Sequence, residues 1–203
     1  MTLDSDAGAV LEFWFGPMAD GFVVDDRSDL WFRSTSAHDA NVRARFEPLM
    51  LAAAAGELDS WKSTAQGTLA LVILLDQFSR NIYRGTDRAF AFDAKAQQLV
   101  EEAIVHGYDL KLPFEQRAFF YLPFEHQESL AAQERCVTLF ERLHDETPKG
   151  FRDRTGRYLR NAHQHRDVIR RFGRFPRRNR PLGRSSTDEE EEYLRRASGS
   201  FDQ

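Results

Sequence analysis

The stretch that decides the fold is 66–81, which reads Q-G-T-L-A-L-V-I-L-L-D-Q-F-S-R-N. The apolar residues at 69–75 cover nearly every side of a helix, a pattern typical of a helix buried at the centre of a domain. Asp76 and Arg80 follow four residues apart, so they share one face of that helix. Because the helix is predicted to be central, this face is expected to point inward.

Two interpretations of this polar end are open. An unpaired charge in a protein interior is costly, so the charges at 76 and 80 must have partners. In the structural interpretation, Asp76 and Arg80 form an ion pair that ties helices together. In the functional one, the row forms the floor of a polar pocket and its members bind a ligand: Asp76, Gln77, Arg80 and Asn81.

Signals for helices recur along the rest of the chain, and strand signals are nearly absent. We therefore predict an all-α fold: a single helical domain over 1–203, a bundle of seven to eight antiparallel helices. Ser5 or Asp6 should cap the first helix, and Thr86 the fourth. The expected helices are 7–15, 36–56, 66–81, 87–106, 113–122, 128–143, 151–172 and a short one after Thr187, where Thr187-x-x-Glu190 forms a capping box.

Composition limits the class of protein. The single cysteine, Cys136, excludes an intrachain disulfide and is expected to be a buried small apolar side chain. The longest apolar run, 69–75, is far shorter than the roughly 20 residues of a membrane span. Residues 1–8 have no basic run, so we expect no signal peptide and a cytoplasmic location. No membrane association is expected, and the oligomeric state is not predicted.

Charge is distributed unevenly along the chain. Residues 1–150 carry 14 Lys+Arg against 24 Asp+Glu, whereas residues 151–184 carry 12 Arg against 2 Asp. The basic block either pairs with the acidic body or forms a site for an anion. Nucleic acid is not expected as a partner because the chain is acidic overall and the basic block has no lysine.

The second polar motif is 122–129, L-P-F-E-H-Q-E-S. Pro123 is expected to end the preceding helix, which places the motif at the start of the next one. Glu125 and Glu128 would then favour the positive end of that helix. Alternatively, Glu125 and His126 could form an acid–base pair. His126 and Glu128 alone are too few ligands for a metal, so no metal or other cofactor is predicted.

The third motif starts within the helix predicted at 151–172. His165 shares its apolar stripe with Tyr158 and Ile169, so it is either a satisfied core histidine or a base. Gly173 should end this helix with a positive φ. An arginine-rich, proline-stiffened segment follows, and arginine suits bidentate binding of carboxylate or phosphate. Its members are Arg174, Arg177, Arg178, Arg180 and Arg184.

The three motifs together resemble the bacterial domain-of-unknown-function 924 family. The resemblance rests on L-D-Q-F-S-R-N, L-P-F-E-H-Q-E-S and R-F-G-R-F-P-R-R-N…L-G-R, and on V-L-E-F-W-F-G, D-L-W-F and G-E-L-D-S-W. It covers about residues 7–196. It implies an all-helical fold similar to tetratricopeptide-repeat proteins and implies no activity. One departure is Arg177, where we expect histidine in many members, so any catalytic scheme built on that histidine would not apply here.

We expect the three motifs to meet in one pocket between helices. Glu125, His126 and His165 are the catalytic candidates. The ligand-binding candidates beyond the first motif are Glu128, Arg174, Arg178, Asn179 and Arg184. Three functions stay open: binding of a small anionic molecule or peptide, an enzyme (hydrolase or lyase) that uses a Glu/His pair, and a scaffold for protein interactions.

Overall fold

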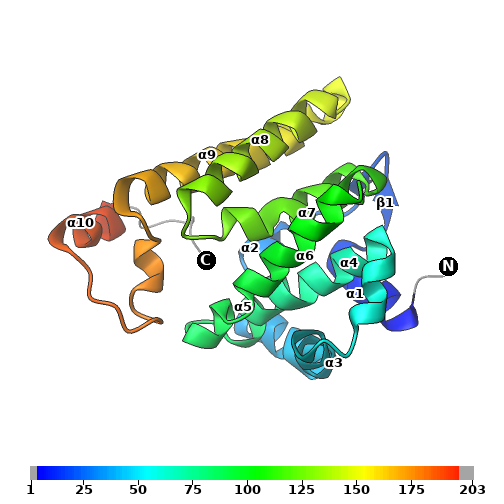
Figure 1. Ribbon diagram of the computed structural model, residues 1–203, viewed down its shortest axis with the longest axis horizontal. Helices are drawn as coiled ribbons and strands as arrows, with labels where there is room; N and C mark the ends of the chain where they lie inside the picture. The colour runs from blue at the N-terminus through cyan, green and yellow to red at the C-terminus, as the bar shows by residue number, and fades with distance from the viewer. Residues whose placement is uncertain (1–3, 197–203) are drawn as a thin grey trace. The chain divides into compact units, whose positions relative to one another are not determined.

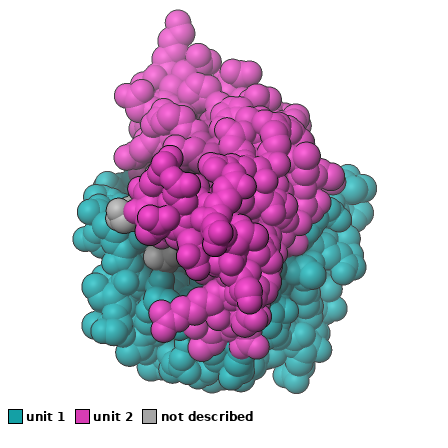
Figure 2. Space-filling model, turned by 90° about the vertical axis from the view of Figure 1, so that its left-hand side faces the viewer, with its two compact units in different colours: residues 1–84, 88–123 teal, residues 85–87, 124–203 magenta. Residues whose placement is uncertain are grey.

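The computed structural model describes residues 4–196, which divide into two compact units. Of the described residues, unit 1 comprises 4–84 and 88–123, and unit 2 comprises 85–87 and 124–196. Figure 2 colours unit 1 teal and unit 2 magenta. The prediction that 1–203 form a single domain therefore stays a prediction.

The predicted all-helical class is confirmed (Figure 1). In residues 4–196 the only strands are β1 (Met18–Ala19) and β2 (Phe22–Val23), which form one short antiparallel pair. When α4, η2 and α5 are taken as one continuous helix, the described chain has nine helices, against the seven or eight predicted. The resemblance to a tetratricopeptide-repeat stack is not tested and stays a prediction.

Unit 1 contains most of the helices. Their bounds are α1 (Ser5–Phe15), α2 (Ser28–Phe32), α3 (Ser36–Ala55), η1 (Asp59–Ser63), α4 (Ala65–Val72), η2 (Ile73–Phe78), α5 (Ser79–Ile82), α6 (Asp93–Val105), η4 (Asp109–Lys111) and α7 (Phe114–Glu125), whose last two residues belong to unit 2. The additional helix is α2, which lies between the helices expected at 7–15 and 36–56. The cap of α1 is Asp4, whose carboxylate accepts from the Asp6 amide, so the predicted caps Ser5 and Asp6 were wrong.

Two predicted helix boundaries are also wrong. The fourth helix was expected to begin at Asp87 with Thr86 as its cap, but 87–90 form a separate 3-10 turn, η3 (Asp87–Phe90), and α6 begins at Asp93. Pro123 does not break the fifth helix: α7 contains it and continues to Glu125. A proline inside a helix removes one backbone hydrogen bond and its ring crowds the carbonyl four residues earlier. Pro123 lies in the last turn of α7, and the helix continues for two residues beyond it. Glu125 therefore ends α7 instead of beginning the next helix.

The decisive stretch is one helix with a widened central part. Residues of η2, I-L-L-D-Q-F, form π-helical turns between α4 and α5, whereas a regular α-helix was predicted. Such turns are rare, and they are frequent at functional sites. Side chains bind two of its carbonyls: Ser79 Oγ donates to the Leu75 oxygen at 2.7 Å, and Arg80 Nη1 donates to the Asp76 oxygen at 2.8 Å. These contacts satisfy backbone groups at the widened turn.

The core of unit 1 is aromatic, which accounts for part of the high phenylalanine content. Trp14 of α1 is fully buried and meets Phe78 and Phe119 edge-on, with ring centroids 5.5 and 5.8 Å apart. Edge-to-face pairs of this kind add stability beyond the area they bury. The central helix thus packs its last π-helical residue, Phe78, against the first helix of the chain.

Unit 2 is built on a helical hairpin. Helices α8 (Leu130–Glu146) and α9 (Arg152–Phe172) lie side by side and are joined through η5 (Lys149–Phe151) (Figure 1). Gly173 ends α9 with φ +70°, as predicted. After η6 (Pro176–Arg178) the chain forms α10 (Asp188–Arg196), and Tyr193 of α10 packs on Phe172 with ring centroids 5.1 Å apart. Cys136 is fully buried in α8, and burial, with the nearby Glu125 carboxylate, raises the pKa of its thiol.

Within residues 4–196 no helix combines sufficient length with sufficient apolar character to cross a bilayer.

Candidate ligand-binding site

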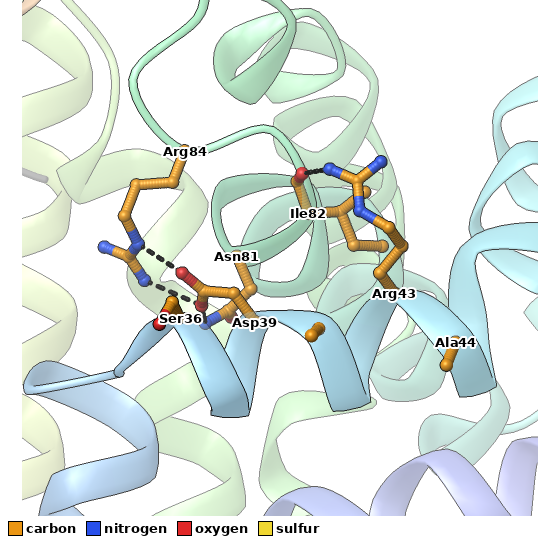
Figure 3. A pocket seen from close by; sticks show the side chains of 8 residues that line it. Ser36, Asp39, Arg43, Ala44, Asn81, Ile82 and Arg84 are labelled. Carbon is orange, nitrogen blue, oxygen red and sulfur yellow. Dashed lines mark hydrogen bonds and ion pairs between the residues drawn. The ribbon is translucent and has the colours of Figure 1, made fainter.

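A cavity of about 380 Å³ lies in unit 1 between α3 and the end of α5 (Figure 3). Helix α3 supplies one side of the cavity, with three small residues at intervals of four and two charged residues. The end of α5 and the turn after it supply the other side. The lining residues are Ser36, Asp39, Ala40, Arg43, Ala44, Asn81, Ile82 and Arg84. Asn81, the last residue of the first motif, therefore lines this cavity.

Asp39 is the centre of a hydrogen-bond cluster at one end of the cavity. Its Oδ1 accepts from Asn81 Nδ2 and from Ser34 Oγ, both at 2.8 Å. Arg84 adds two donors, Nε to Oδ2 at 2.7 Å and Nη2 to Oδ1 at 3.2 Å. Burial alone would raise the pKa of Asp39, but the hydrogen bonds from Arg84, Asn81 and Ser34 outweigh it and lower that pKa. Asp39 is therefore an ionised acceptor at neutral pH.

Arg43 lies at the other end of the cavity. Its Nη2 donates to the carbonyl oxygen of Ile82, near the end of α5 (Figure 3). Its Nη1 lies 3.4 Å from Glu47, one turn further along α3, and about half of its side chain is exposed. Exposed pairs at this separation contribute little energy. The guanidinium is thus held in place while much of its surface faces solvent.

The rest of the first motif is buried in an ion-pair network. Arg80 joins two carboxylates: Nη1 and Nη2 bind Asp93 at 2.9 and 3.0 Å, and Nη1 lies 3.2 Å from Asp76. Gln77 Nε2 donates to Asp76 Oδ2 at 2.6 Å. Burial would lower the pKa of Arg80, but the charges of Asp76 and Asp93 outweigh it and raise that pKa. The predicted Asp76–Arg80 pair is present, with Asp93 as a partner that was not predicted.

Two arginines of the third motif bind glutamates in unit 2. Arg184 donates to both oxygens of Glu128 at 2.6 and 2.8 Å, and the Phe175 amide also donates to Glu128. Arg174 donates to both oxygens of Glu190 at 2.7 and 2.8 Å. Burial would raise the pKa of Glu128, but the bonds from Arg184 and the Phe175 amide outweigh it and lower that pKa. Each of these two guanidinium groups already holds a carboxylate of the protein.

The other candidates of the third motif are buried beside these pairs. Arg178 is 6% exposed, and its guanidinium lies 4.7 Å from the centre of the Phe175 ring. Asn179 is 1% exposed and donates to Ser186 and Glu190 at 3.1 and 3.2 Å. This packing joins η6 and α10 within unit 2.

The catalytic candidates Glu125 and His165 lie close together. Glu125 Oε1 is 3.4 Å from His165 Nδ1, and both residues are buried. The same Nδ1 lies 2.9 Å from the backbone oxygen of Asn161, a geometry that favours a proton on Nδ1 and leaves Nε2 as the basic nitrogen. His126, the third candidate, is buried directly after α7. In residues 4–196 there is no group of three His, Cys, Asp or Glu side chains that could hold a metal ion.

Comparison with known proteins decides the family. The model of a bacterial protein family of unknown function, DUF924, matches residues 10–198. The chain belongs to this family. A similar solved structure, the protein of unknown function ATU0120 from Agrobacterium tumefaciens, is 40% identical, with a TM-score of 0.80 over 96% of this chain and 98% of the other. No curated protein matches the chain.

Several residues that line the cavity were not predicted. Asp39, Arg43 and Arg84 form most of the polar lining of the cavity, yet their sequence context is that of ordinary charged residues at a helix start and on a helix surface. Only Asn81 among the predicted ligand-binding residues lines the cavity, whereas Asp76, Gln77 and Arg80 lie in the buried network. Whether the first motif meets the other two in one pocket stays a prediction, as do the catalytic and ligand-binding roles.

Proposed function

We propose that the protein binds a small anionic ligand, bearing a phosphate or a carboxylate, in the cavity of unit 1. The observation that supports this proposal is the composition of the lining. The lining contains two arginines, Arg43 and Arg84, and one carboxylate, Asp39, so it carries a net positive charge. The volume of about 380 Å³ lies within the roughly 300–1,000 Å³ usual for small-molecule sites.

The arginines of the third motif support the proposal less well. We expected Arg174, Arg178 and Arg184 to hold the anionic group. Because Arg174 and Arg184 each bind both oxygens of a glutamate, a ligand would have to displace a protein carboxylate there. Arg43, by contrast, has a weak exposed ion pair with Glu47, a hydrogen bond to a carbonyl and a contact with the Tyr83 ring at 5.6 Å, and it holds no carboxylate by two hydrogen bonds. The cavity therefore has the cationic group that is easier for a ligand to reach.

The test is a thermal-shift screen of the purified protein against phosphate, nucleotides and small carboxylates, repeated with Arg43→Gln. A ligand at 100 times its dissociation constant stabilises the folded state by about 2.7 kcal/mol, which gives a shift of a few degrees. We expect anions to raise the melting temperature of the wild type and to lose this effect in Arg43→Gln.

Arg45→Gln is the matched control, because Arg45 is an exposed arginine of the same helix that stacks on Phe13 and does not line the cavity. It should keep the shift. The proposal fails if no anion stabilises the wild type, or if Arg43→Gln responds to anions as the wild type does.

A second candidate function is acid–base catalysis, which the separation of 3.4 Å between Glu125 and His165 favours. A carboxylate next to Nδ1 stabilises the imidazolium that forms when Nε2 takes a proton, so the pair could serve a hydrolase or a lyase. The test is a panel of phosphatase, esterase and lyase substrates with wild type and Glu125→Gln. An activity that drops by about 100-fold in Glu125→Gln, with an unchanged melting temperature, would support catalysis. Equal activity in both proteins would exclude this role.

A further inference from the structure

The two ends of the cavity in unit 1 differ in charge, and this difference bears on which anion it binds. Arg84 and Asp39 lie together at one end, whereas Arg43 lies with Ile82 at the other (Figure 3). Along α3, Asp39 and Arg43 are four residues apart, so the ends are separated by about one helical turn, roughly 5.4 Å.

The Arg84 end is electrically neutral. Arg84 gives two donors to the Asp39 carboxylate, and Asn81 and Ser34 add one each. Such a bidentate pair compensates both charges and leaves hydrogen-bonding capacity rather than net charge. Ser36, exposed in the first turn of α3, lines the cavity beside this pair, and its hydroxyl can both donate and accept hydrogen bonds (Figure 3). This end suits a neutral polar group.

The Arg43 end carries the net positive charge of the lining. Its nearest carboxylate, Glu47, is 3.4 Å away, does not line the cavity and also accepts from the Tyr83 hydroxyl at 3.0 Å. A single anionic group can therefore bind at Arg43 without displacing a bidentate partner. A second anionic group at the other end would meet the Asp39 carboxylate, which like charge disfavours.

The middle of the cavity is small and apolar. Ala40 lies on α3 between Asp39 and Arg43, and Ile82 of α5 lines the cavity on the side opposite α3 (Figure 3). Alanine methyl groups leave room for a short chain of carbon atoms and offer it no hydrogen bond. The part of a ligand that joins its two polar ends should accordingly be short and apolar.

We propose that the ligand carries one anionic group, bound at Arg43, and one neutral hydroxyl- or amide-like group, bound at Ser36 and Asp39, with a short apolar spacer between them. This inference rests on the proposed function. It narrows the ligand to short hydroxy acids and their analogues, and it excludes dicarboxylates of the same length as the preferred class.

Calorimetric titration with compounds of equal chain length tests the inference: butyrate, γ-hydroxybutyrate and succinate. In the wild type, γ-hydroxybutyrate should bind about three- to tenfold more tightly than butyrate, the gain expected for one hydrogen bond. Succinate should bind no more tightly than butyrate. Ser36→Ala should reduce the advantage of γ-hydroxybutyrate and leave butyrate unchanged.

Asp39→Asn should change the preference of the cavity in favour of a dicarboxylate. The substitution keeps the shape of the side chain but removes the negative charge that Arg84 binds at this end, so the charge of this end rises by one unit. The ratio of succinate to butyrate affinity should then rise by about tenfold over the wild-type ratio. Ser36→Ala removes no ion pair, so the inference remains testable if Asp39→Asn does not fold.

The outcomes separate the inference from the proposed function. If wild type binds these carboxylates through Arg43 but prefers succinate to γ-hydroxybutyrate, the inference is wrong and the proposed function stands. The inference is also overturned if Ser36→Ala leaves every affinity unchanged. If no anion in the wider screen binds and Arg43→Gln has no effect, the proposed function itself is wrong.

Discussion

Arg174 holds Glu190 by two parallel hydrogen bonds, from Nε to Oε1 at 2.7 Å and from Nη2 to Oε2 at 2.8 Å. The same glutamate accepts from the Thr187 amide at 2.8 Å and so completes the capping box of α10. One carboxylate thus fixes both the start of α10 and its attachment to the segment that follows α9. The paired charges join two parts of unit 2 that are 16 residues apart in sequence.

Acid should weaken this attachment within a defined pH range. The hydrogen bonds from Arg174, with smaller contributions from Thr187 and Asn179, outweigh burial and lower the pKa of Glu190 from 4.5 to about 2. A lowered folded-state pKa contributes stability that is complete above pH 4.5 and is lost as the pH falls toward 2. We expect Glu190→Gln to be less stable than wild type at pH 7, and the difference in unfolding free energy to shrink between pH 4.5 and 2.

Urea unfolding followed by circular dichroism at a series of pH values measures this difference. Glu189→Gln is the matched control, because Glu189 pairs with Arg171 at 2.7 Å with more than half of each side chain exposed. Exposed pairs contribute little, so Glu189→Gln should stay close to wild type at every pH. A constant difference between Glu190→Gln and wild type over the acid range would contradict the prediction.

The sequence predicts the contacts of Glu190 with residues nearby in the chain and does not predict its contact with a distant residue. Thr187 and Glu190 are three residues apart, so the capping box is a local pattern, and its prediction is confirmed. The pairing of Arg174 with Glu190 requires the chain to reverse after Gly173, and no local rule states which acid then meets the arginine. The sequence therefore predicted an arginine-rich segment and left its partners open.

Replacement of Arg80 should destabilise the protein strongly. Arg80→Met removes the guanidinium that joins the buried carboxylates of Asp76 and Asp93. Loss of one partner of a buried ion pair costs about 3–5 kcal/mol. Arg142→Met is the control: Arg142 pairs with Glu146 at 2.8 Å on an exposed helix surface, where a loss below about 1 kcal/mol is expected. Chemical unfolding of both variants gives the two values, and equal losses would refute a special role for Arg80.

The widened helical turn before Arg80 is a feature that the spacing of apolar residues in the sequence does not predict. The apolar run 69–75 correctly predicted a buried central helix, and Asp76 and Arg80 do lie together. The π-helical turns of η2 were not predicted, because a sequence buried on all sides gives no sign of one extra residue in a turn. The buried acid Asp93 was missed for a similar reason, since it resembles an ordinary acid in the first turn of α6.

Gln133 should stabilise the end of α7. Its fully buried side-chain Nε2 lies 2.6 Å from the Glu125 oxygen, 2.9 Å from the Gln127 oxygen and 3.4 Å from the Phe124 oxygen. Carbonyls at a helix end need such donors, because they have no partner within the helix. Gln133→Met should therefore lower the unfolding free energy by about 1–3 kcal/mol.

The same substitution at Gln98 separates this effect from a general effect of methionine. Gln98 is exposed on α6 and binds Glu102 of the same helix at 2.8 Å. Gln98→Met should change stability by less than about 0.5 kcal/mol, as surface substitutions usually do. Hydrogen exchange of the amides near 124–127 should also speed up in Gln133→Met. If the two variants are equally stable, the donor at the end of α7 is dispensable.

Gly67 should tolerate no side chain, although its backbone is an ordinary helical one. A Cβ atom at this position would lie 2.2 Å from the backbone oxygen of Trp61, far inside van der Waals contact. The backbone of η1 cannot move away as a flexible side chain would, and the Gly67 amide is held by Thr64 Oγ1 at 3.0 Å. Gly to Ala normally stabilises a helix interior by roughly 0.5–1 kcal/mol, whereas here the clash should make Gly67→Ala destabilising by about 1–3 kcal/mol.

Gly150→Ala is the control, since nothing lies within 4 Å of a Cβ there, and it should change stability by less than about 0.5 kcal/mol. Chemical unfolding of both variants measures the contrast, and a Gly67→Ala protein as stable as wild type would show that η1 yields to the added methyl group.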